Sequence, residues 1–502
     1  MQKCRILIIK SLMIAILCSI SFITNASSVE SFFEEHIHNG EGVEANTIQS
    51  NSIAKWTYMV YASWDTPIGS SIVKNDSQYF LDVMTYIGSN EDLNLVMLLD
   101  VQVPEDKTTF YYFINNGFEN RTWHETDSNM GNKDTLIKFV NKVKDEFPAE
   151  KYALILKSPR GMSWQGLCKD DDVCKLATQS DLEKQTINMP ELAGALAAVT
   201  NNGRDKIDLI GFSTCITGSL EVAYQISPYA NYMVASEENM HSITSNAEYA
   251  WPFNKSLQVL KDNTDMNGEE FAKSIVQNFK AGKNISAYLR CTPFRKIVNI
   301  PVDTTLSAIN LSKIEDLVIS IDNLASILSD NINSYRVKIK QSRSEARRFG
   351  PWYGRTRFGY ALYLPIFRNT MEKLGIPFYM DVWLDIYHFT ELLSSKISDD
   401  DPESDKVIKA CQEVMYTLNE SVIANNVSEG DNAHGLHIYF PPAADKYNVH
   451  LWFTCFGLKR AYACYEKVNF AHSTCWNEML YKVYRIPDFL VNIWLKRKIP
   501  LF

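Results

Sequence analysis

Cys215 is the residue of this sequence whose surroundings best suit covalent chemistry. It follows a short, mostly apolar run at 207–212 (I-D-L-I-G-F), and a helical pattern of apolar residues begins at Ser219. A buried strand that ends in a turn of small residues and leads into a helix presents that turn at the carboxyl end of the strand, where open α/β sheets bind their ligands. Cys215 is therefore either a nucleophile or a small buried apolar residue.

The elements that would position Cys215 alternate along the chain between buried strands and amphipathic helices. Runs of apolar, branched and aromatic residues predict strands at 55–62, 93–99, 152–156, 207–212 and 232–235. Apolar residues at helical spacing predict helices at 76–87, 134–147, 189–199 and 268–279. This alternation predicts an α/β fold with a mostly parallel sheet and helices on both faces, followed by an α+β region from residue 286.

The N-terminus has the pattern of a secretory signal. Lys3, Arg5 and Lys10 precede the apolar stretch 11–23, which is too short to span a bilayer comfortably. Small residues at 24–27 fit cleavage after Ala26. We therefore expect a signal peptide at 1–26, a polar mobile leader at 27–54 and a secreted or periplasmic protein, with an uncleaved anchor as the alternative.

Composition and charge narrow the choice of partners. The 502 residues are 46% hydrophobic and 22% charged, as in ordinary globular proteins, and the net charge is -9. Loss of the first 26 residues, which carry three basic residues and no acid, would leave -12. This balance argues against nucleic acid and anionic membranes, and no later stretch is apolar enough for a membrane span. The basic segment 341–357 is expected to be a solvated or acid-paired face rather than a binding patch.

The cysteines predict structure rather than metal binding. Ten cysteines fall to eight after signal cleavage, and an exported protein meets oxidising conditions. Cys168 and Cys174 flank an acidic tip at 170–172 and are predicted to close this loop as a disulfide. No pair has Cys-x-x-Cys spacing and no histidine cluster accompanies them, so no structural zinc site is expected. No glycine-rich phosphate loop follows a strand, so nucleotide binding finds no support.

A set of local strings resembles the clostripain family of cysteine peptidases, which has a caspase-like fold. The strings occur in the family's order over residues 55–445, and they lie at 55–61, 152–156, 189–192, 207–212 with Cys215, 221–224, 232–238, 381–389 and 438–441. The resemblance implies a caspase-like domain at 55–285 and a C-terminal region at 286–502. It also implies a peptide or protein as substrate or ligand.

The resemblance further implies a catalytic dyad in which Cys215 stands at the position of the nucleophile. In the family, a histidine after the neighbouring strand handles the protons. Backbone N–H groups near the cysteine and near the glycine after that histidine, here Gly161, stabilise the oxyanion. Ser213, Ser236 and Glu238 are the expected substrate-binding positions.

Two residues depart from the family pattern. Arg160, or Pro159 with a shift of one residue, occupies the position of the histidine, and neither side chain can accept a proton at a working pH. Ser213 occupies a position where the family usually has an aspartate that pairs with the arginine or lysine of a substrate. Both the hydrolysis and the usual preference for basic residues are therefore in doubt.

Other residues leave room for an active site. His241 follows a strand beside the central one and is the best candidate for a substitute base, whereas His437 is expected to be a packing or surface residue. The charge of Arg160 could hold Cys215 as a thiolate, or it could simply pair with Asp208 or Glu238.

The sequence therefore predicts a secreted, clostripain-like protein that is a degenerate cysteine peptidase, with the nucleophile but without its general base. The alternative is an active cysteine endopeptidase with a rearranged base and altered specificity. A third option is a ligand-binding protein with no peptidase action. No cofactor or metal is expected, although the resemblance allows calcium, for which the acidic tip at 170–172 is a candidate or merely a solvated loop.

Overall fold

The computed structural model describes residues 53–64, 70–103, 106–114, 118–123, 128–158, 161, 163–168, 186–240, 250–282, 284–289, 296–301, 304–350, 382–397, 402–443, 449–454, 457–462 and 465–485. The predicted signal peptide and nearly all of the predicted leader lie outside these residues.

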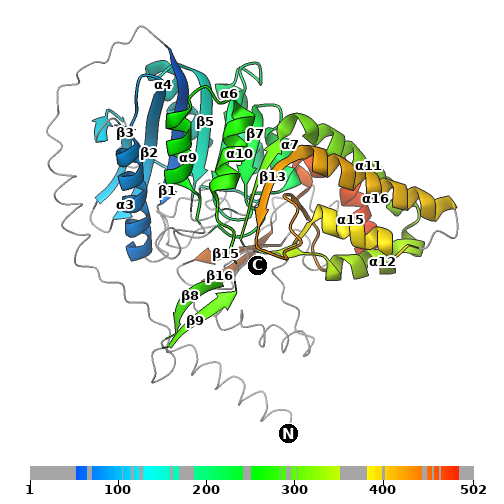
Figure 1. Cartoon of the computed structure of the whole chain (residues 1–502). Helices are drawn as coiled ribbons and strands as arrows, with labels where there is room; N and C mark the ends of the chain where they lie inside the picture. The colour runs from blue at the N-terminus through cyan, green and yellow to red at the C-terminus, as the bar shows by residue number, and fades with distance from the viewer. Residues whose placement is uncertain are drawn as a thin grey trace.

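A nine-stranded sheet forms the centre of the described part of the molecule (Figure 1). Its strands lie in the order β13-β10-β7-β6-β5-β1-β2-β3-β4. Five of them pair in parallel: β7 (Ala230–Ala235), β6 (Ile207–Ser213), β5 (Ala149–Lys157), β1 (Ala54–Trp64) and β2 (Leu93–Val103). Antiparallel strands extend both edges: β10 (Thr305–Asn310) and β13 (Val422–Val427) at one, β3 (Asp106–Ile114) and β4 (Phe118–Arg121) at the other. The predicted mostly parallel sheet is confirmed.

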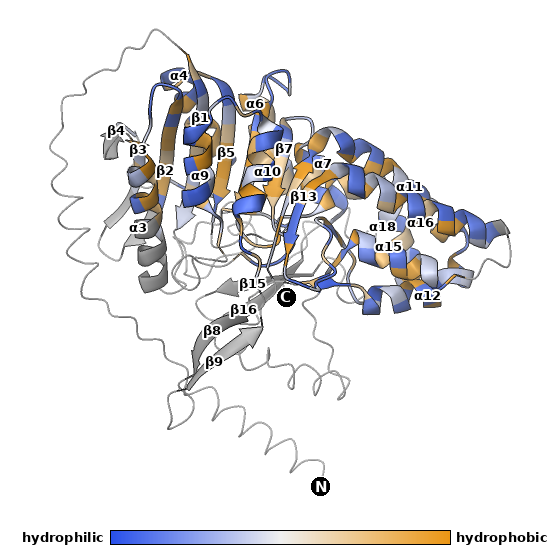
Figure 2. Cartoon of the chain, viewed as in Figure 1, coloured by the Kyte–Doolittle hydropathy of each residue, from blue (hydrophilic) through white to orange (hydrophobic). Residues whose placement is uncertain are grey.

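Helices cover both faces of this sheet, because side chains of successive strand residues point to opposite faces. Tyr58 of β1 packs edge-on against Phe271, whereas Tyr61 packs against Phe139 on the other side. One face carries α3 (Ser70–Ile87), α9 (Phe253–Asp262) and α10 (Gly268–Asn278). The other carries α4 (Lys133–Glu146), α6 (Met189–Val199) and α7 (Leu220–Ile226). The strands are therefore apolar along most of their length (Figure 2).

Local signals fix where the predicted helices begin. Asn188 and Glu191 form a reciprocal capping box at the start of α6, and Asn267 and Glu270 form another at the start of α10. Each box satisfies backbone N–H groups that have no partner inside the helix. Ser219 caps α7 by accepting a hydrogen bond from Val222 N–H.

The C-terminal half adds a helical layer and a small sheet. The helices are η2 (Leu311–Lys313), α11 (Ile314–Asp330), α12 (Ile332–Glu345), α15 (Ile386–Ser395), α16 (Pro402–Ser421), η5 (Tyr465–Lys467), α17 (Asn469–Ser473) and α18 (Trp476–Tyr484). The small sheet has the order β11 (Arg348–Phe349), β12 (Trp383–Asp385), β14 (His437–Tyr439). Two hairpins pair β8 (Asn284–Leu289) with β9 (Lys296–Pro301) and β15 (Val449–Thr454) with β16 (Gly457–Tyr462). Since β10 and β13 belong to the central sheet, residues on both sides of position 285 build it.

Cys168 differs from its predicted role. It is a free thiol, buried in the core with a left-handed backbone (φ 52°), rather than half of the predicted disulfide. Its side chain is fully buried in the large apolar cluster that also contains Leu167 and Ile187. Its expected partner Cys174 lies outside the described residues. None of the described helices is long and apolar enough to cross a membrane.

Candidate active site

Cys215 lies in a tight turn between β6 and α7, at the carboxyl end of the central strands. The turn places Ile216 in the left-handed region with φ 51°, a conformation that a β-branched residue rarely adopts. Such strain of about 1–3 kcal/mol persists only where the surrounding structure holds it. Cys215 itself is half-buried, so its thiol is not simply a core residue.

Residues 236–240, which we call the strap, hold the turn from one side. Gly218 N–H donates to Ser236 O at 2.7 Å, and Ile216 N–H donates to Glu238 O at 3.1 Å. The thiol of Cys215 lies 3.7 Å from Met240 O. A Cβ atom on Gly218 would come within 2.8 Å of Glu237 N, so only glycine allows this approach.

Gly161 closes on the turn from the other side. A Cβ atom at this position would lie 2.3 Å from Thr214 Oγ1 and 2.8 Å from Cys215 O. The segment that carries Gly161 is fixed by antiparallel bridges from Gly161 to Leu167 and from Leu167 to Ile187. The backbone after β5 therefore touches the Cys215 turn directly, at the residue that follows position 160 in the sequence.

The three predicted substrate-binding residues lie at this end of the sheet, but their polar groups differ. Ser213 is buried, and its hydroxyl has no hydrogen-bond partner in the described part of the chain. The Ser236 hydroxyl donates to Glu238 O at 2.9 Å and lies 3.0 Å from the hydroxyl of Thr305. Glu238 is buried, and its carboxylate binds Asn239 N–H at 2.9 Å and the guanidinium of Arg347 at 3.3 Å.

Arg160 and His241 lie outside the described residues, so their roles stay predictions. Of the histidines whose ring contacts are described, His437 lies against the Cys215 turn, where its backbone N–H donates to Gly218 O at 2.9 Å, whereas His388 and His434 contact Arg347 and Asp385. His388 Nδ1 accepts a hydrogen bond from Arg347 N–H at 3.0 Å, and His434 Nδ1 donates to Asp385 at 3.0 Å. His437 is buried between the rings of Phe349 and Trp383, and burial lowers its pKa to about 3. His437 is thus a packing residue, as predicted.

The sequence profile of the clostripain family matches residues 72–483. The chain belongs to the clostripain family. It is 24% identical over 449 residues to clostripain of Hathewaya histolytica, a match that covers 80% of this chain and 77% of that protein.

Two solved structures share the fold of this clostripain-family chain. A secreted C11 cysteine protease from Bacteroides thetaiotaomicron, in complex with an irreversible peptide inhibitor, superposes with a TM-score of 0.53 at 15% identity, over 85% of this chain and 100% of that chain. An inactive zymogen C11 protease from Parabacteroides distasonis gives 0.50 at 16% identity, over 78% and 93%. The caspase-like fold inferred from the sequence is therefore confirmed.

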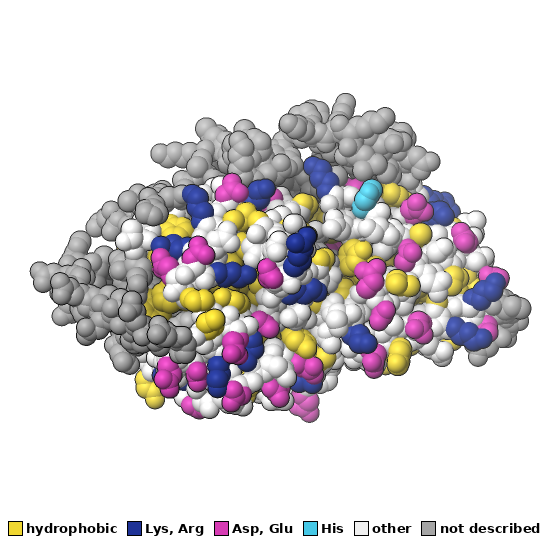
Figure 3. Space-filling model, turned by 90° about the horizontal axis from the view of Figure 1, so that it is seen from above, with side chains coloured by type: hydrophobic (Ala, Val, Ile, Leu, Met, Phe, Trp, Pro, Cys, Tyr) yellow, Lys and Arg dark blue, Asp and Glu magenta, His cyan; other side chains and the backbone are white. Residues whose placement is uncertain are grey.

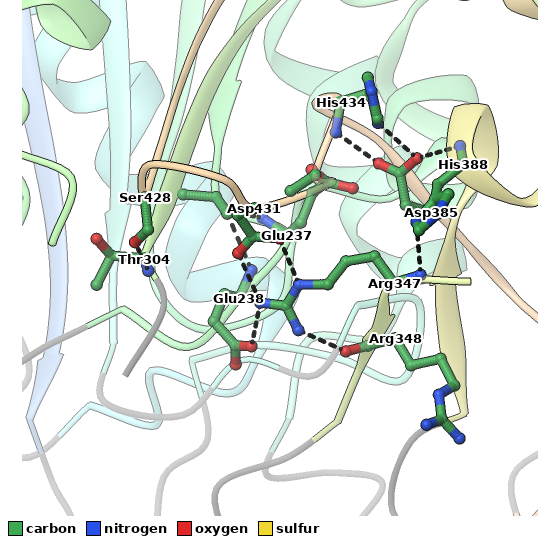
Figure 4. A network of polar contacts seen from close by, with 12 residues as sticks. Glu237, Glu238, Thr304, Arg347, Arg348, Asp385, His388, Ser428, Asp431 and His434 are labelled. Carbon is green, nitrogen blue, oxygen red and sulfur yellow. Dashed lines mark hydrogen bonds and ion pairs between the residues drawn. The ribbon is translucent and has the colours of Figure 1, made fainter. Parts of the chain in front are cut away.

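A polar cluster behind the strap is the part of the site that sequence reasoning missed (Figure 4). Arg347 binds Asp431 through Nε at 2.6 Å and through Nη2 at 3.0 Å, in addition to Glu238. Arg347 belongs to the basic segment 341–357, so the acid-paired interpretation holds for this residue. The cluster also contains Glu237, Asp385 and His434, which come from segments far apart in the sequence. Only the adjacent acids Glu237 and Glu238 at a strand end offered a local signal.

A second buried carboxyl, Glu221, supports the helix that follows Cys215. Its Oε1 accepts hydrogen bonds from Tyr439 N–H at 2.8 Å and from the Tyr465 hydroxyl at 2.9 Å, while Oε2 has no hydrogen-bond partner among the described residues. Burial raises the pKa of Glu221 to about 7. The Tyr465 ring packs on Trp164, which lies three residues beyond Gly161, so this buried group links both sides of the turn.

The described residues offer no arrangement of three or more His, Cys, Asp or Glu that fits a metal ion. The acidic tip at 170–172, which was the candidate for calcium, lies outside them. The polar cluster behind the strap contains a guanidinium at its centre, which is unsuited to a cation. No step of the chemistry is therefore assigned to calcium.

Proposed function

We propose that this clostripain-family chain is a degenerate cysteine peptidase that binds a peptide at the Cys215 turn without hydrolysing it efficiently. The contact of Gly161 with Thr214 and Cys215 carries the proposal, since Gly161 directly follows in the sequence the position at which the family has its histidine. That residue is Arg160, which cannot accept a proton from the thiol or give one to an amine leaving group.

The peptide that binds would not be selected for arginine or lysine. Ser213 supplies a neutral hydroxyl at the position of the family's aspartate, and the Glu238 carboxylate is already bound to Arg347 and Asn239. A substrate guanidinium would thus lose its hydration without meeting an available charge from these residues. Seen from above, acidic and basic side chains are mixed over the surface, without a large basic face in this view (Figure 3).

The decisive experiment combines labelling with rescue. Purified protein is treated with a thiol-directed peptide electrophile and, separately, with a panel of fluorogenic peptides. We expect labelling that is lost in Cys215→Ala, with no turnover above that variant. Arg160→His should then raise hydrolysis by about 10²–10⁴-fold, the usual contribution of a general base. Arg160→Gln, which removes the charge without supplying a base, is the matched control.

The opposite outcome favours the alternative, an active endopeptidase with His241 as the base. In that case the wild-type protein turns over peptides, and both Cys215→Ala and His241→Ala abolish the turnover. Labelling that persists without turnover, and that weakens in Arg160→Gln, supports a thiolate held by Arg160.

We further propose export through the N-terminal signal at 1–26. The charged start and the apolar stretch 11–23 support this assignment. Expression of the full chain, followed by N-terminal sequencing of the protein outside the cytoplasm, should give a start at Ser27. An intact N-terminus in the membrane fraction would indicate an uncleaved anchor.

A further inference from the structure

Glu237 and Asp385 are two carboxyl groups held side by side in the interior. Gly435 N–H donates to Glu237 Oε2 at 2.8 Å, and His434 N–H donates to Asp385 Oδ2 at 2.6 Å. Because His434 and Gly435 are neighbours in the chain, their amide nitrogens are within a few ångströms of each other, and so are the carboxyls they bind. Figure 4 shows the two side chains turned toward one another. Both residues are fully buried.

Two buried carboxyls in contact cannot both be ionised at neutral pH, so one of them keeps a proton. The hydrogen bonds identify which one. Asp385 accepts three, from His388 N–H at 2.7 Å, His434 N–H and His434 Nδ1, which stabilise a carboxylate. Glu237 accepts one, and its Oε1 has no donor among the residues that the structure describes. The guanidinium of Arg347 is bound to Glu238 and Asp431 instead.

We propose that Glu237 carries the shared proton and donates it to Asp385, and that this carboxyl pair positions the strap against the Cys215 turn. The pair joins the strap to β12 and to the segment that contains His434 and Gly435. The strap in turn binds Ile216 and Gly218 through its backbone carbonyls. Glu237 is thus a positioning residue, and its role holds whether or not the site hydrolyses peptides.

Charged groups on every neighbouring element act on Glu237. Burial and then the charge of Asp385 raise the pKa of Glu237 well above its ordinary range. Burial lowers the pKa of His434, but the bond to Asp385, the charges of Asp385 and Glu391 and the backbone of Asn432 together outweigh that effect and leave a net increase. Burial lowers the pKa of His388. The titratable and charged groups that surround the pair are Glu238, Arg347, Asp385, His388, Glu391, Asp431 and His434.

These pKa shifts predict that the contact between the strap and the Cys215 turn is most stable when Glu237 is protonated. A folded-state pKa above the unfolded value means that the stabilisation is present below the unfolded pKa and is lost as pH rises through the folded pKa. The contribution of His434 to stability is also lost as pH rises, because its pKa is raised. The contribution of His388, whose pKa is lowered, is lost as pH falls. The strap should therefore loosen on the alkaline side, which exposes Cys215.

The test compares the wild-type protein with Glu237→Gln, which keeps a donor toward Asp385 but cannot ionise. Melting temperature and the rate of Cys215 alkylation by iodoacetamide are followed from pH 5 to pH 9. We expect the wild-type protein to lose several degrees relative to the variant as pH rises, and the ratio of wild-type to variant alkylation rates to grow about fivefold. Glu269→Gln, at an exposed ion pair on α10, should follow the wild-type protein.

Infrared spectroscopy reads the proton directly. In a Glu221→Gln background, which removes a second fully buried acid with a raised pKa among the described residues, the carbonyl band of a protonated carboxyl should persist at pH 7 and disappear in Glu237→Gln. Asp385→Asn should let Glu237 ionise at lower pH, so this measurement still decides if Glu237→Gln fails to fold. Parallel pH profiles of wild-type protein and Glu237→Gln, or no protonated band at pH 7, would overturn the proposal.

Discussion

The two sides of the strap differ in how their polar groups are satisfied. On the Cys215 side, the hydroxyls of Ser213 and Thr214 are buried without hydrogen-bond partners among the described residues, and Arg160 and Ser213 are predicted to replace the family's histidine and aspartate. On the far side, Glu238, Asp385 and Asp431 all have hydrogen-bonded or charged partners. The contrast indicates that the polar contacts supporting the Cys215 turn are intact, whereas the residues predicted to do chemistry beside it differ from the family pattern.

Removal of Arg347 is expected to lower the free energy of unfolding more than any other substitution considered below. Arg347→Ala leaves the buried carboxylates of Glu238 and Asp431 without their cation, and removing one partner of a buried ion pair costs about 3–5 kcal/mol. Urea unfolding measures the change in the free energy of unfolding. Lys273→Ala, at an ion pair near the surface of α10, is the control and should stay close to wild type. A loss below about 1 kcal/mol for Arg347→Ala would show that Glu238 and Asp431 do not depend on the charge of Arg347.

Glu221→Gln tests whether burial raises the pKa of the Glu221 carboxyl in the helix after the Cys215 turn. Burial raises its pKa from 4.5 to about 7, so its stabilisation is present below about pH 4.5 and is lost as pH rises through about 7. The carboxamide keeps an oxygen acceptor for Tyr439 and Tyr465. Relative to this variant, the wild-type protein should lose about 2–4 kcal/mol between pH 5 and pH 9, measured by urea unfolding. Equal losses in both proteins would refute the titration.

Gly161→Ala tests the contact on which the proposed function rests. The added methyl group would collide with Thr214 and with the carbonyl of Cys215, which should lower the free energy of unfolding by about 1–3 kcal/mol and change the rate of Cys215 labelling. Gly194→Ala in α6 meets nothing within 4 Å and should stabilise by about 0.5–1 kcal/mol. If Gly161→Ala behaves like Gly194→Ala, the two segments do not touch as described.

The smallest change in stability is expected from substitution of two serines, one on the Cys215 side and one in the strap. Ser213→Ala removes a buried hydroxyl that has no hydrogen-bond partner among the described residues. The free energy of unfolding of this variant should therefore remain within about 0.5 kcal/mol of wild type or rise. Ser236→Ala removes an acceptor of Glu238 N–H and a partner of Thr305, and should cost about 1–2 kcal/mol. Thermal unfolding of both variants decides. A larger loss for Ser213→Ala would mean that its hydroxyl has a hidden partner.

Much of the fold was predictable because its signals are local. Period-two and period-3.6 patterns over 5–20 residues located the central strands and the helices between them, and capping residues such as Asn188 mark the helix starts. Cys168 shows the limit of such reasoning. Its spacing to Cys174 favoured a disulfide, but its side chain is buried in an apolar cluster built from segments far apart in the sequence.

The sequence by itself determined the order of strands and helices and the place of Cys215 after the central strand, and it predicts that Arg160 stands where the family has its histidine. Only the tertiary structure decided that Gly161 touches the Cys215 turn and that Glu237 meets Asp385 behind it. The physical reason is that backbone propensity and polarity act within a few residues, whereas burial and the sharing of a proton depend on which distant segments the fold brings together.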